Sequence, residues 1–221
     1  MFEASEVSFS YGRHRVLNQI SLEAGPGDCV GIIGANGCGK TTLLSILAGA
    51  VRTGRGTISM DGMALTRRGL FRTYIGYVPQ ECPLFPELSV QDNLKLWMED
   101  GRNLRSLLTE GSLKILELAP VFKKPVYQLS GGMKKRVSIG CAMISNPPVM
   151  ILDEPGAALD LVCKDAIRRY LEAYRDSGGT ILLATHEDQE LSLCNRLYVL
   201  RDGSLHPVDC CLRGSGLTSL F

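Results

Sequence analysis

Short apolar runs alternate along this chain with segments of helical periodicity. Residues 28–34, 147–155 and 178–186 are almost continuously apolar, which is typical of strands buried on both faces of a sheet. A further run, residues 74–80, predicts another strand that stops at Pro79. Because helical patterns separate these strands, the chain predicts an α/β fold with a mostly parallel sheet covered on both faces.

Alternating apolar and polar positions predict a second group of strands near the two ends of the chain. Residues 2–11 and 15–24 predict two strands joined by a Tyr-Gly turn, and residues 54–63 predict a strand that ends in an Asp-Gly turn. Residues 196–208 predict a terminal hairpin with Asp-Gly at its turn. We therefore expect antiparallel N-terminal strands beside the parallel sheet.

Helical periodicity predicts helices at residues 40–50, 89–100 and 104–119. Two further helices are expected from Gly132 to about Ser145 and from Asp160 to about Tyr174. Apolar residues three or four positions apart define their inward faces. These residues are Met133, Val137, Cys141 and Ile144 in the first helix, and Val162, Ala166, Ile167, Tyr170, Leu171 and Tyr174 in the second.

The predicted elements fit one domain at residues 1–208. Its core would comprise residues 1–80 and 147–208, and the strand-free block at about 81–146 would be an inserted helical subdomain. Residues 209–221 are rich in Gly and Ser, and we expect a poorly ordered tail there.

Composition narrows the function. Lys and Arg number 24 against 23 Asp and Glu, which argues against a nucleic-acid binder with a broad basic face. No apolar run approaches the roughly 20 residues that span a bilayer, and the acidic N-terminus lacks the basic region of a signal peptide. None of the eight cysteines forms a C-x-x-C pair, so reduced thiols are expected. If the chain works at a membrane, we expect another chain to span it.

A glycine-rich stretch between a predicted strand and a predicted helix carries the clearest chemistry. Residues 34–41 fit G-x-x-x-x-G-K-[ST], a motif whose main-chain N–H groups cradle phosphates at a helix N-terminus. We expect Lys40 to neutralise β- and γ-phosphate charge and the Thr41 hydroxyl to ligate Mg²⁺. The predicted ATP-binding residues of this phosphate loop (residues 34–42) are Gly34, Ala35, Asn36, Gly37, Cys38, Gly39, Lys40, Thr41 and Thr42.

The cysteine inside this loop allows two interpretations. The helix N-terminus and the neighbouring ammonium favour a reactive thiolate at Cys38. Alternatively, the side chain points into the protein and is shielded.

Two acidic residues lie at the end of the strand predicted at 147–155. A buried carboxylate is costly unless it meets a cation, so Asp153 is expected to hold the Mg²⁺ of MgATP. Glu154 would then orient and polarise the attacking water as a general base. The alternative, two acids that cap the following helix, is disfavoured by the phosphate loop.

The stretch LSGGMKKR, residues 129–136, narrows the function further because it resembles the signature of ATP-binding-cassette (ABC) proteins. The resemblance extends over residues 2–208 and implies a P-loop NTPase core. It also implies four more site residues. These are Tyr11, which matches the aromatic residue that stacks on adenine; Gln80, which matches the glutamine that senses Mg²⁺ and water; Asp160, in the loop of residues 158–160 after the catalytic Glu154; and His186, which matches the switch histidine at the γ-phosphate.

The resemblance also implies a dimer. Ser130 fits a helix N-cap, and the glycines after it would leave the helix N-terminus bare as a second anion site. In the family, two subunits meet head to tail, and the signature of one closes on the ATP of the other. The residues expected to reach the partner's ATP are Ser130, Gly131, Gly132 and Asp160.

Three positions in two motifs depart from the family pattern. The usual final Gln of the signature is Met133, and the usual Thr-Ser after the catalytic acid and proline is Gly156-Ala157. Polar groups near the dimer interface are therefore missing. These departures bear on the rate and tightness of the dimer rather than on the ATP site.

The resemblance implies an ATPase subunit that dimerises on ATP, with a second copy of itself or with a related cassette. This dimer would drive a separate transmembrane permease. The chain also has a weak likeness to exporter-type ATPases. Such a subunit is cytoplasmic, peripheral on the cytoplasmic face of the membrane, and binds no nucleic acid. One alternative is a soluble ABC-type ATPase acting on nucleic acid or ribosomes, usually with two cassettes per chain or a long coiled coil. The other, a small-molecule kinase or switch-type NTPase, would lack the signature.

A predicted loop after Gln80, residues 81–89, concentrates Leu84, Phe85 and Leu88 together with two prolines. We expect this loop to form part of the docking surface for the membrane subunit. The alternative is that these side chains pack into the local core.

Overall fold

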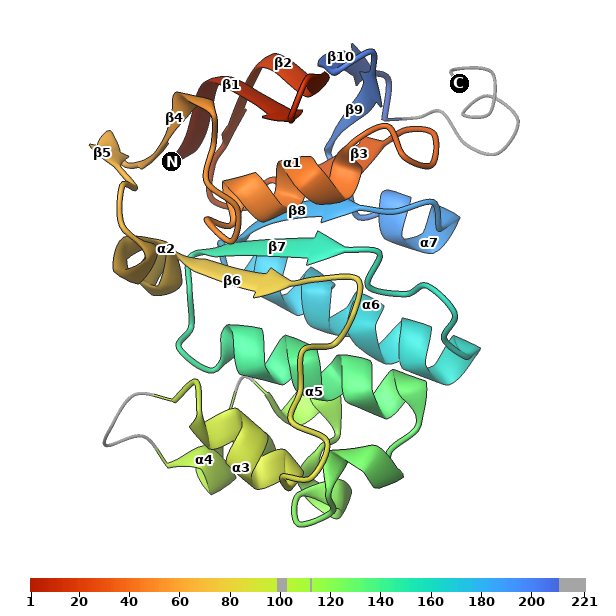
Figure 1. Ribbon diagram of the computed structural model, residues 1–221. Coiled ribbons are helices and arrows are strands. Elements are labelled where there is room, and N and C mark those ends of the chain that lie inside the picture. Colours follow the sequence, from red (N-terminus) through yellow and green to blue (C-terminus); the bar gives the residue numbers. More distant parts are fainter. Residues whose placement is uncertain (99–102, 112, 211–221) are drawn as a thin grey trace.

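The computed structural model describes residues 1–98, 103–111 and 113–210, so nearly all of the predicted tail lies outside the described residues. Its strands form two sheets (Figure 1). The smaller sheet is antiparallel, as predicted for the N-terminal strands. Its spatial order is β2 (His14–Ala24), β1 (Phe2–Tyr11), β4 (Arg55–Met60) and β5 (Met63–Ala64).

The larger sheet contains six strands, five of them parallel. The antiparallel sixth strand forms the predicted C-terminal hairpin. Every residue of the three central strands is buried, which explains their continuously apolar sequences. The spatial order is β10 (Ser204–Val208), β9 (Arg196–Arg201), β3 (Cys29–Ile33), β8 (Thr180–Ala184), β7 (Val149–Asp153) and β6 (Ile75–Val78). The α/β fold with antiparallel N-terminal strands is therefore confirmed.

Helices cover both faces of the larger sheet (Figure 1). One face packs on α1 (Lys40–Leu47), whose buried leucines share a core with the antiparallel sheet. The other face packs on α5 (Gly131–Met143) and α6 (Leu161–Asp176), whose apolar residues form a second core. The phosphate loop and α1 thus lie between the two sheets.

The block between β6 and β7 is helical, as the sequence predicts. Its short helices share the core of α5 and α6. Two other short helices lie elsewhere in the chain. Among its described residues, the block contains α3 (Val90–Lys95), α4 (Leu104–Thr109), three 3₁₀ turns (Lys114–Leu116, Ala119–Val121 and Val126–Gln128) and α5; the two short helices elsewhere are α2 (Arg68–Tyr74) and α7 (Asp188–Leu191). Among the described residues, no helix is both long and apolar enough to cross a bilayer.

The helix predicted at 104–119 is wrong in its length. Helix α4 ends at Thr109, because the chain folds back on itself there: the Gly111 amide donates to the Ser106 carbonyl oxygen (2.9 Å). The next turn is a 3₁₀ helix that ends at Glu117, which has a positive φ of 53°. The helix predicted at 89–100 is shortened to six residues, and its last two positions lie outside the described residues.

One inward position predicted for α6 is also wrong. Val162 is 71% exposed, and Cys163 is buried in its place. Asp160 caps the helix by accepting a hydrogen bond from the Cys163 amide (2.8 Å), and this first turn exposes Leu161 and Val162 while Cys163 points inward. The buried face then follows the expected spacing, with Ala166, Ile167, Tyr170 and Leu171.

Candidate functional site

Three neighbouring parallel strands bring the predicted site residues to one edge of the larger sheet. The phosphate loop follows β3, Asp153 ends β7, and His186 follows β8. Since β3, β8 and β7 are adjacent and parallel, their carboxyl ends meet at the same edge. Such an edge is where open α/β sheets bind ligands.

Lys40 lies across the phosphate loop. Its ammonium donates to the carbonyl oxygens of Gly34 (2.7 Å) and Ala35 (3.2 Å), and its side chain is buried. Gly39 precedes α1 with a φ of 110°, a backbone conformation that is unfavourable for any residue other than glycine. The first turn of α1 therefore presents its free N–H groups beside a fixed cation, which suits a phosphate.

The Cys38 thiol faces the protein. Its Sγ atom lies 2.6 Å from the position that a Cβ on Gly34 would occupy, and the half-buried side chain packs against the core of α1 and the antiparallel sheet. A Gly34 side chain would also meet the Leu200 carbonyl oxygen at 2.7 Å, so only glycine fits there. Of the two interpretations of Cys38, this geometry favours the shielded thiol.

Asp153 has the features of a cation ligand. Only 1% of its surface is exposed, and its Oδ2 atom has no hydrogen-bond partner within the described part of the chain. Burial raises the pKa of this carboxyl, while a hydrogen bond with the Thr41 hydroxyl opposes that shift. A buried carboxylate with one unpaired oxygen beside a hydroxyl is a donor set that a hard divalent cation such as Mg²⁺ fits.

Gln80, Glu154 and His186 converge on one another from three separate segments. The Gln80 Nε2 atom donates to Glu154 Oε2 (3.0 Å), and Glu154 Oε1 lies 3.9 Å from His186 Nε2. The Glu154 amide donates to the Ala184 carbonyl oxygen (2.9 Å), which extends the pairing of β7 and β8 to this residue. Glu154 has a positive φ of 48°, an unfavourable conformation for a non-glycine residue that is often found at functional sites.

His186 is set to be neutral near pH 7. Burial and the Lys40 ammonium lower the pKa of the imidazole, and the Glu154 carboxylate only partly opposes them. A neutral imidazole has one N–H donor and one acceptor nitrogen. His186 can therefore donate a hydrogen bond to one group while it accepts one from another.

Sequence analysis missed Lys135 beside this site. Its buried ammonium donates to the carbonyl oxygens of Pro79 (2.9 Å) and Gln80 (3.0 Å), and burial lowers its pKa. Lys135 thus fastens α5 to the segment that carries Gln80. The only signal in the sequence was its place in the signature, because the predicted inward face of α5 did not include it.

The residues predicted to act across a dimer lie outside this cluster. Ser130 caps α5 by accepting a hydrogen bond from the Met133 amide (3.3 Å), and both Ser130 and Gly131 are exposed. Gly132 is buried, and a Cβ there would meet Cys163 Sγ at 2.3 Å. The signature therefore packs tightly on the start of α6, where Asp160 is exposed.

Tyr11 is an exposed aromatic at the end of β1. Its ring is 58% exposed and packs edge-on against Phe9, with the ring centroids 4.9 Å apart. The ring is therefore accessible for contact, as an adenine platform needs.

Comparison with known proteins identifies the family. The family model for ABC transporters matches residues 17–157. A probable ABC transporter ATP-binding protein of Azorhizobium caulinodans is 34% identical over 203 residues, which cover 89% of this chain and 72% of the relative. The Nod factor export ATP-binding protein I of Paraburkholderia xenovorans is 36% identical over 209 residues, which cover 91% of this chain and 68% of the relative.

A solved structure gives the same result. The dimeric post-hydrolysis state of an ATP-binding cassette, bound to ADP and inorganic phosphate, superposes with a TM-score of 0.83 at 26% identity, covering 97% of this chain and all of that one. The sequence matches and the superposition both extend across the phosphate loop, the signature and the strand that carries Asp153. The chain therefore belongs to the ABC transporter family and is an ATP-binding cassette ATPase.

Proposed function

We propose that this chain is the ATP-hydrolysing subunit of a transporter whose membrane-spanning permease is a separate chain. The convergence of Gln80, Glu154 and His186 beside Lys40 is the observation that supports hydrolysis most directly. Glu154 is the general base that takes a proton from the attacking water. Gln80 and His186 hold the water and the γ-phosphate in place, which supplies the positioning that phosphoryl transfer requires.

Charge neutralisation at the triphosphate comes from the phosphate loop and from Mg²⁺. Lys40 and the N–H groups of residues 34–42 bind the β- and γ-phosphates. Thr41, Gln80 and Asp153 are the proposed Mg²⁺ ligands, and the unpaired Oδ2 atom of Asp153 supports this assignment. When bound there, Mg²⁺ would supply positive charge that offsets the negative charge of the triphosphate.

Each ATP is proposed to lie between two cassettes, either two copies of this chain or this chain and a related one. The phosphate loop and Tyr11 of one subunit hold the nucleotide. Ser130, Gly131, Gly132 and Asp160 of the other close on it. The exposed N-terminus of α5, capped by Ser130 and thirteen residues long, supports an anion contact in trans.

The proposed permease site is a cavity of about 670 Å³ between the core and the helical block. It is mostly apolar at its base, and the Arg72 guanidinium lies 5.4 Å from the centroid of the Trp97 ring at its edge. Such a cavity suits a short helix of another protein. Its walls include Gly49, Phe71, Tyr77, Leu84, Trp97 and Ala142.

The loop at residues 81–89 borders this cavity. Leu84 lines it and Phe85 is 55% exposed beside it. The Asn93 side chain fixes this loop: it accepts from the Phe85 amide (2.8 Å) and donates to the carbonyl oxygen of the same residue (3.0 Å). Phe85 is therefore held outward by the backbone, as a docking residue would be.

The proposed direction and place of transport rest on the relatives alone. The Nod factor export protein supports export, and the family supports a cassette at the cytoplasmic face of a membrane. A net charge of +1 and the absence of any basic tract argue against nucleic acid as the partner. A pull-down of the chain from a detergent extract tests this: a polytopic membrane protein is expected, whereas nucleic acid or ribosomal protein would contradict it.

Replacing Phe85 with Asp is expected to uncouple transport from ATP hydrolysis. The change puts a charge into the proposed docking surface, where it is desolvated on assembly and weakens binding by several-fold or more. The catalytic residues are untouched, so the ATPase rate and nucleotide affinity of the isolated subunit stay close to wild type. The measurement is transport and ATPase activity of the assembled transporter in proteoliposomes.

Met63→Asp is the matched control, because Met63 is another exposed apolar residue, in β5 of the antiparallel sheet. It is expected to leave both activities unchanged. Normal assembly and transport with Phe85→Asp would rule out this docking surface.

A further inference from the structure

A buried carboxyl group that belongs to none of the motifs lies behind the catalytic residues. Glu190 in α7 is only 5% exposed. Its Oε2 atom accepts a hydrogen bond from the Thr185 hydroxyl, and its carboxyl group also accepts one from the Gly156 amide. Thr185 immediately precedes His186, and Gly156 lies two residues after Glu154. One side chain thus contacts both segments that carry the catalytic pair.

The contact with Gly156 accounts for a departure from the family pattern. A Cβ at this position would lie 2.5 Å from Glu190 Oε1, so any larger residue would displace the carboxyl group. The backbone of Gly156 is not in the left-handed region, so only the space beside Glu190 favours glycine here. A larger residue at this position would require the Glu190 side chain to shift.

The contact with Thr185 organises the turn that presents His186. The Thr185 Oγ1 atom donates to Glu190 and accepts from the Glu187 amide (3.0 Å). This hydroxyl is buried, and its two hydrogen bonds join it to Glu187 at the N-cap of α7 and to Glu190 within α7. A buried polar group with all of its partners in place fixes local geometry.

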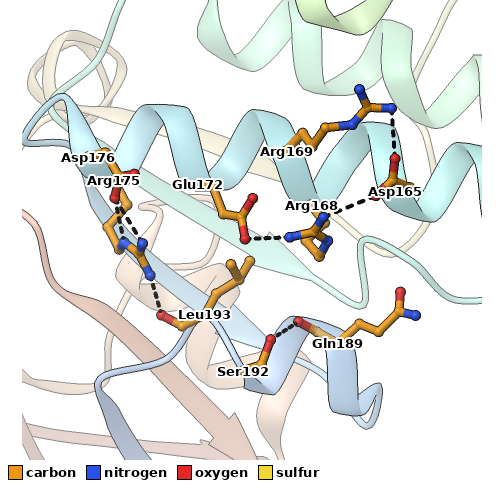
Figure 2. Close-up of polar contacts among 9 residues, drawn as sticks. All are labelled: Asp165, Arg168, Arg169, Glu172, Arg175, Asp176, Gln189, Ser192 and Leu193. Atoms are coloured by element: carbon orange, nitrogen blue, oxygen red, sulfur yellow. Dashed lines mark hydrogen bonds and ion pairs between the residues drawn. The ribbon is translucent and has the colours of Figure 1, made fainter.

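Helix α7 itself is fastened to α6 at both ends. Lys164 near the start of α6 pairs with Glu187 at the N-cap of α7 (2.8 Å). Near the end of α6, Arg175 donates to the carbonyl oxygen of Leu193, just beyond α7 (3.0 Å; Figure 2). Glu190 therefore projects from a fixed support.

Resting on the proposed hydrolysis mechanism, we infer that Glu190 is a positioning residue: it holds the Thr185–His186 turn and the segment after Glu154 in register with each other. Without it, His186 and Glu154 lose their shared support and no longer meet the same γ-phosphate and water. Glu190 does not touch the nucleotide, so its removal lowers kcat rather than ATP affinity.

The ionised carboxylate does this best, because it accepts from both Thr185 and Gly156. Burial raises the pKa of Glu190 to about 7, against the effect of the Thr185 hydrogen bond; Glu187 raises it further and Lys164 lowers it. Protonation makes one oxygen a donor and removes the negative charge, so the hydrogen bonds from Thr185 and Gly156 are weakened. The register of the two segments therefore loosens as the pH falls through this value.

Two variants test the inference by steady-state ATPase measurements at about pH 6 and about pH 8. Glu190→Ala is expected to lower kcat about tenfold or more at both values, with KM for MgATP unchanged within about twofold. Glu190→Gln retains the shape but not the charge. Its kcat is expected to match that of wild type at the lower pH and to be about fivefold lower than that of wild type at the higher pH. At the higher pH, the variant lacks a charge-assisted hydrogen bond that wild type makes.

Glu172→Gln is the control, because Glu172 pairs with Arg168 on the outer face of α6 (Figure 2) and is expected to leave kcat unchanged at both pH values. A wild-type kcat for Glu190→Ala, or a ratio of wild type to Glu190→Gln that does not change with pH, would overturn the inference. If Glu190→Ala fails to fold, Glu190→Gln decides alone. The proposed hydrolysis mechanism does not depend on the role inferred for Glu190, and Glu154→Gln tests that mechanism separately.

Discussion

Replacing Glu154 with Gln is expected to lower kcat about a thousandfold, because an amide cannot take the proton from the attacking water. ATP affinity stays close to wild type, since Glu154 contacts Gln80 and His186 rather than the phosphate loop. Gln fits the same space and the same backbone. An inorganic-phosphate release assay and a fluorescent-nucleotide binding assay measure the two quantities.

The same variant is expected to accumulate as an ATP-bound dimer, because the dimer closes on ATP but cannot hydrolyse it. Size-exclusion chromatography with light scattering would show a mass twice that of the monomer with MgATP, and the monomer mass with ADP. Glu172→Gln serves again as the control. A Glu154→Gln variant with full turnover would contradict the assignment of Glu154 as the general base.

Replacing Asp153 with Asn is expected to have opposite effects on activity and stability. The side chain is buried with one unpaired oxygen, and burial raises its pKa. Without a bound cation, the ionised carboxylate therefore destabilises the folded state. Asn removes the charge and raises the free energy of unfolding by about 1 kcal/mol in the absence of nucleotide. It also removes a Mg²⁺ ligand, so kcat/KM for MgATP falls by about a hundredfold.

Thermal unfolding with and without MgATP measures the stability and the ligand binding, and a phosphate-release assay measures kcat/KM. The melting temperature of Asp153→Asn rises without ligand, and its increase on adding MgATP is smaller than in wild type. Asp165→Asn is the control, because Asp165 pairs with Arg168 and Arg169 on α6 and its pKa is lowered by the hydrogen bond from Arg168 (Figure 2). A less stable Asp153→Asn variant with normal MgATP binding contradicts the proposal.

The hydrophobic pattern and the motifs of the sequence were enough to predict the fold, and several of the predicted site residues lie together at one edge of the larger sheet. The strands β3, β7 and β8 are buried on both faces, so their apolar runs are unambiguous. The phosphate loop fits a spacing that a close approach of backbone to phosphate requires. Local pattern and global structure agree at these places.

Periodicity was less informative where a helix has no single apolar face. Helix α2 buries none of its residues, so no apolar spacing signals it. Helix α5 is buried on nearly all sides between the sheet and the helical block, so Lys135 is inward although it lies off the predicted face. Tertiary packing, which the chain does not display locally, decides both cases.

Long-range polar contacts were not predictable either. Glu190 reaches Gly156 from a helix that begins more than thirty positions further along the chain. Asn93 organises the loop at residues 81–89 through four hydrogen bonds within it, which a sequence motif does not reveal. The departure at Gly156 was visible in the sequence, and its spatial reason came only from the structure.

The central claim is that two cassettes share each ATP, and mixing two inactive variants tests it most directly. Lys40→Ala removes the cation of the phosphate loop. Ser130→Asp keeps the N-cap of α5, since Asp caps helices well, but it sets a carboxylate against the partner's γ-phosphate. We predict that each variant alone is inactive and that their mixture hydrolyses ATP, because a mixed dimer has one site with an intact phosphate loop and an intact signature. A mixture as inactive as its parts, with dimers formed, would contradict the account.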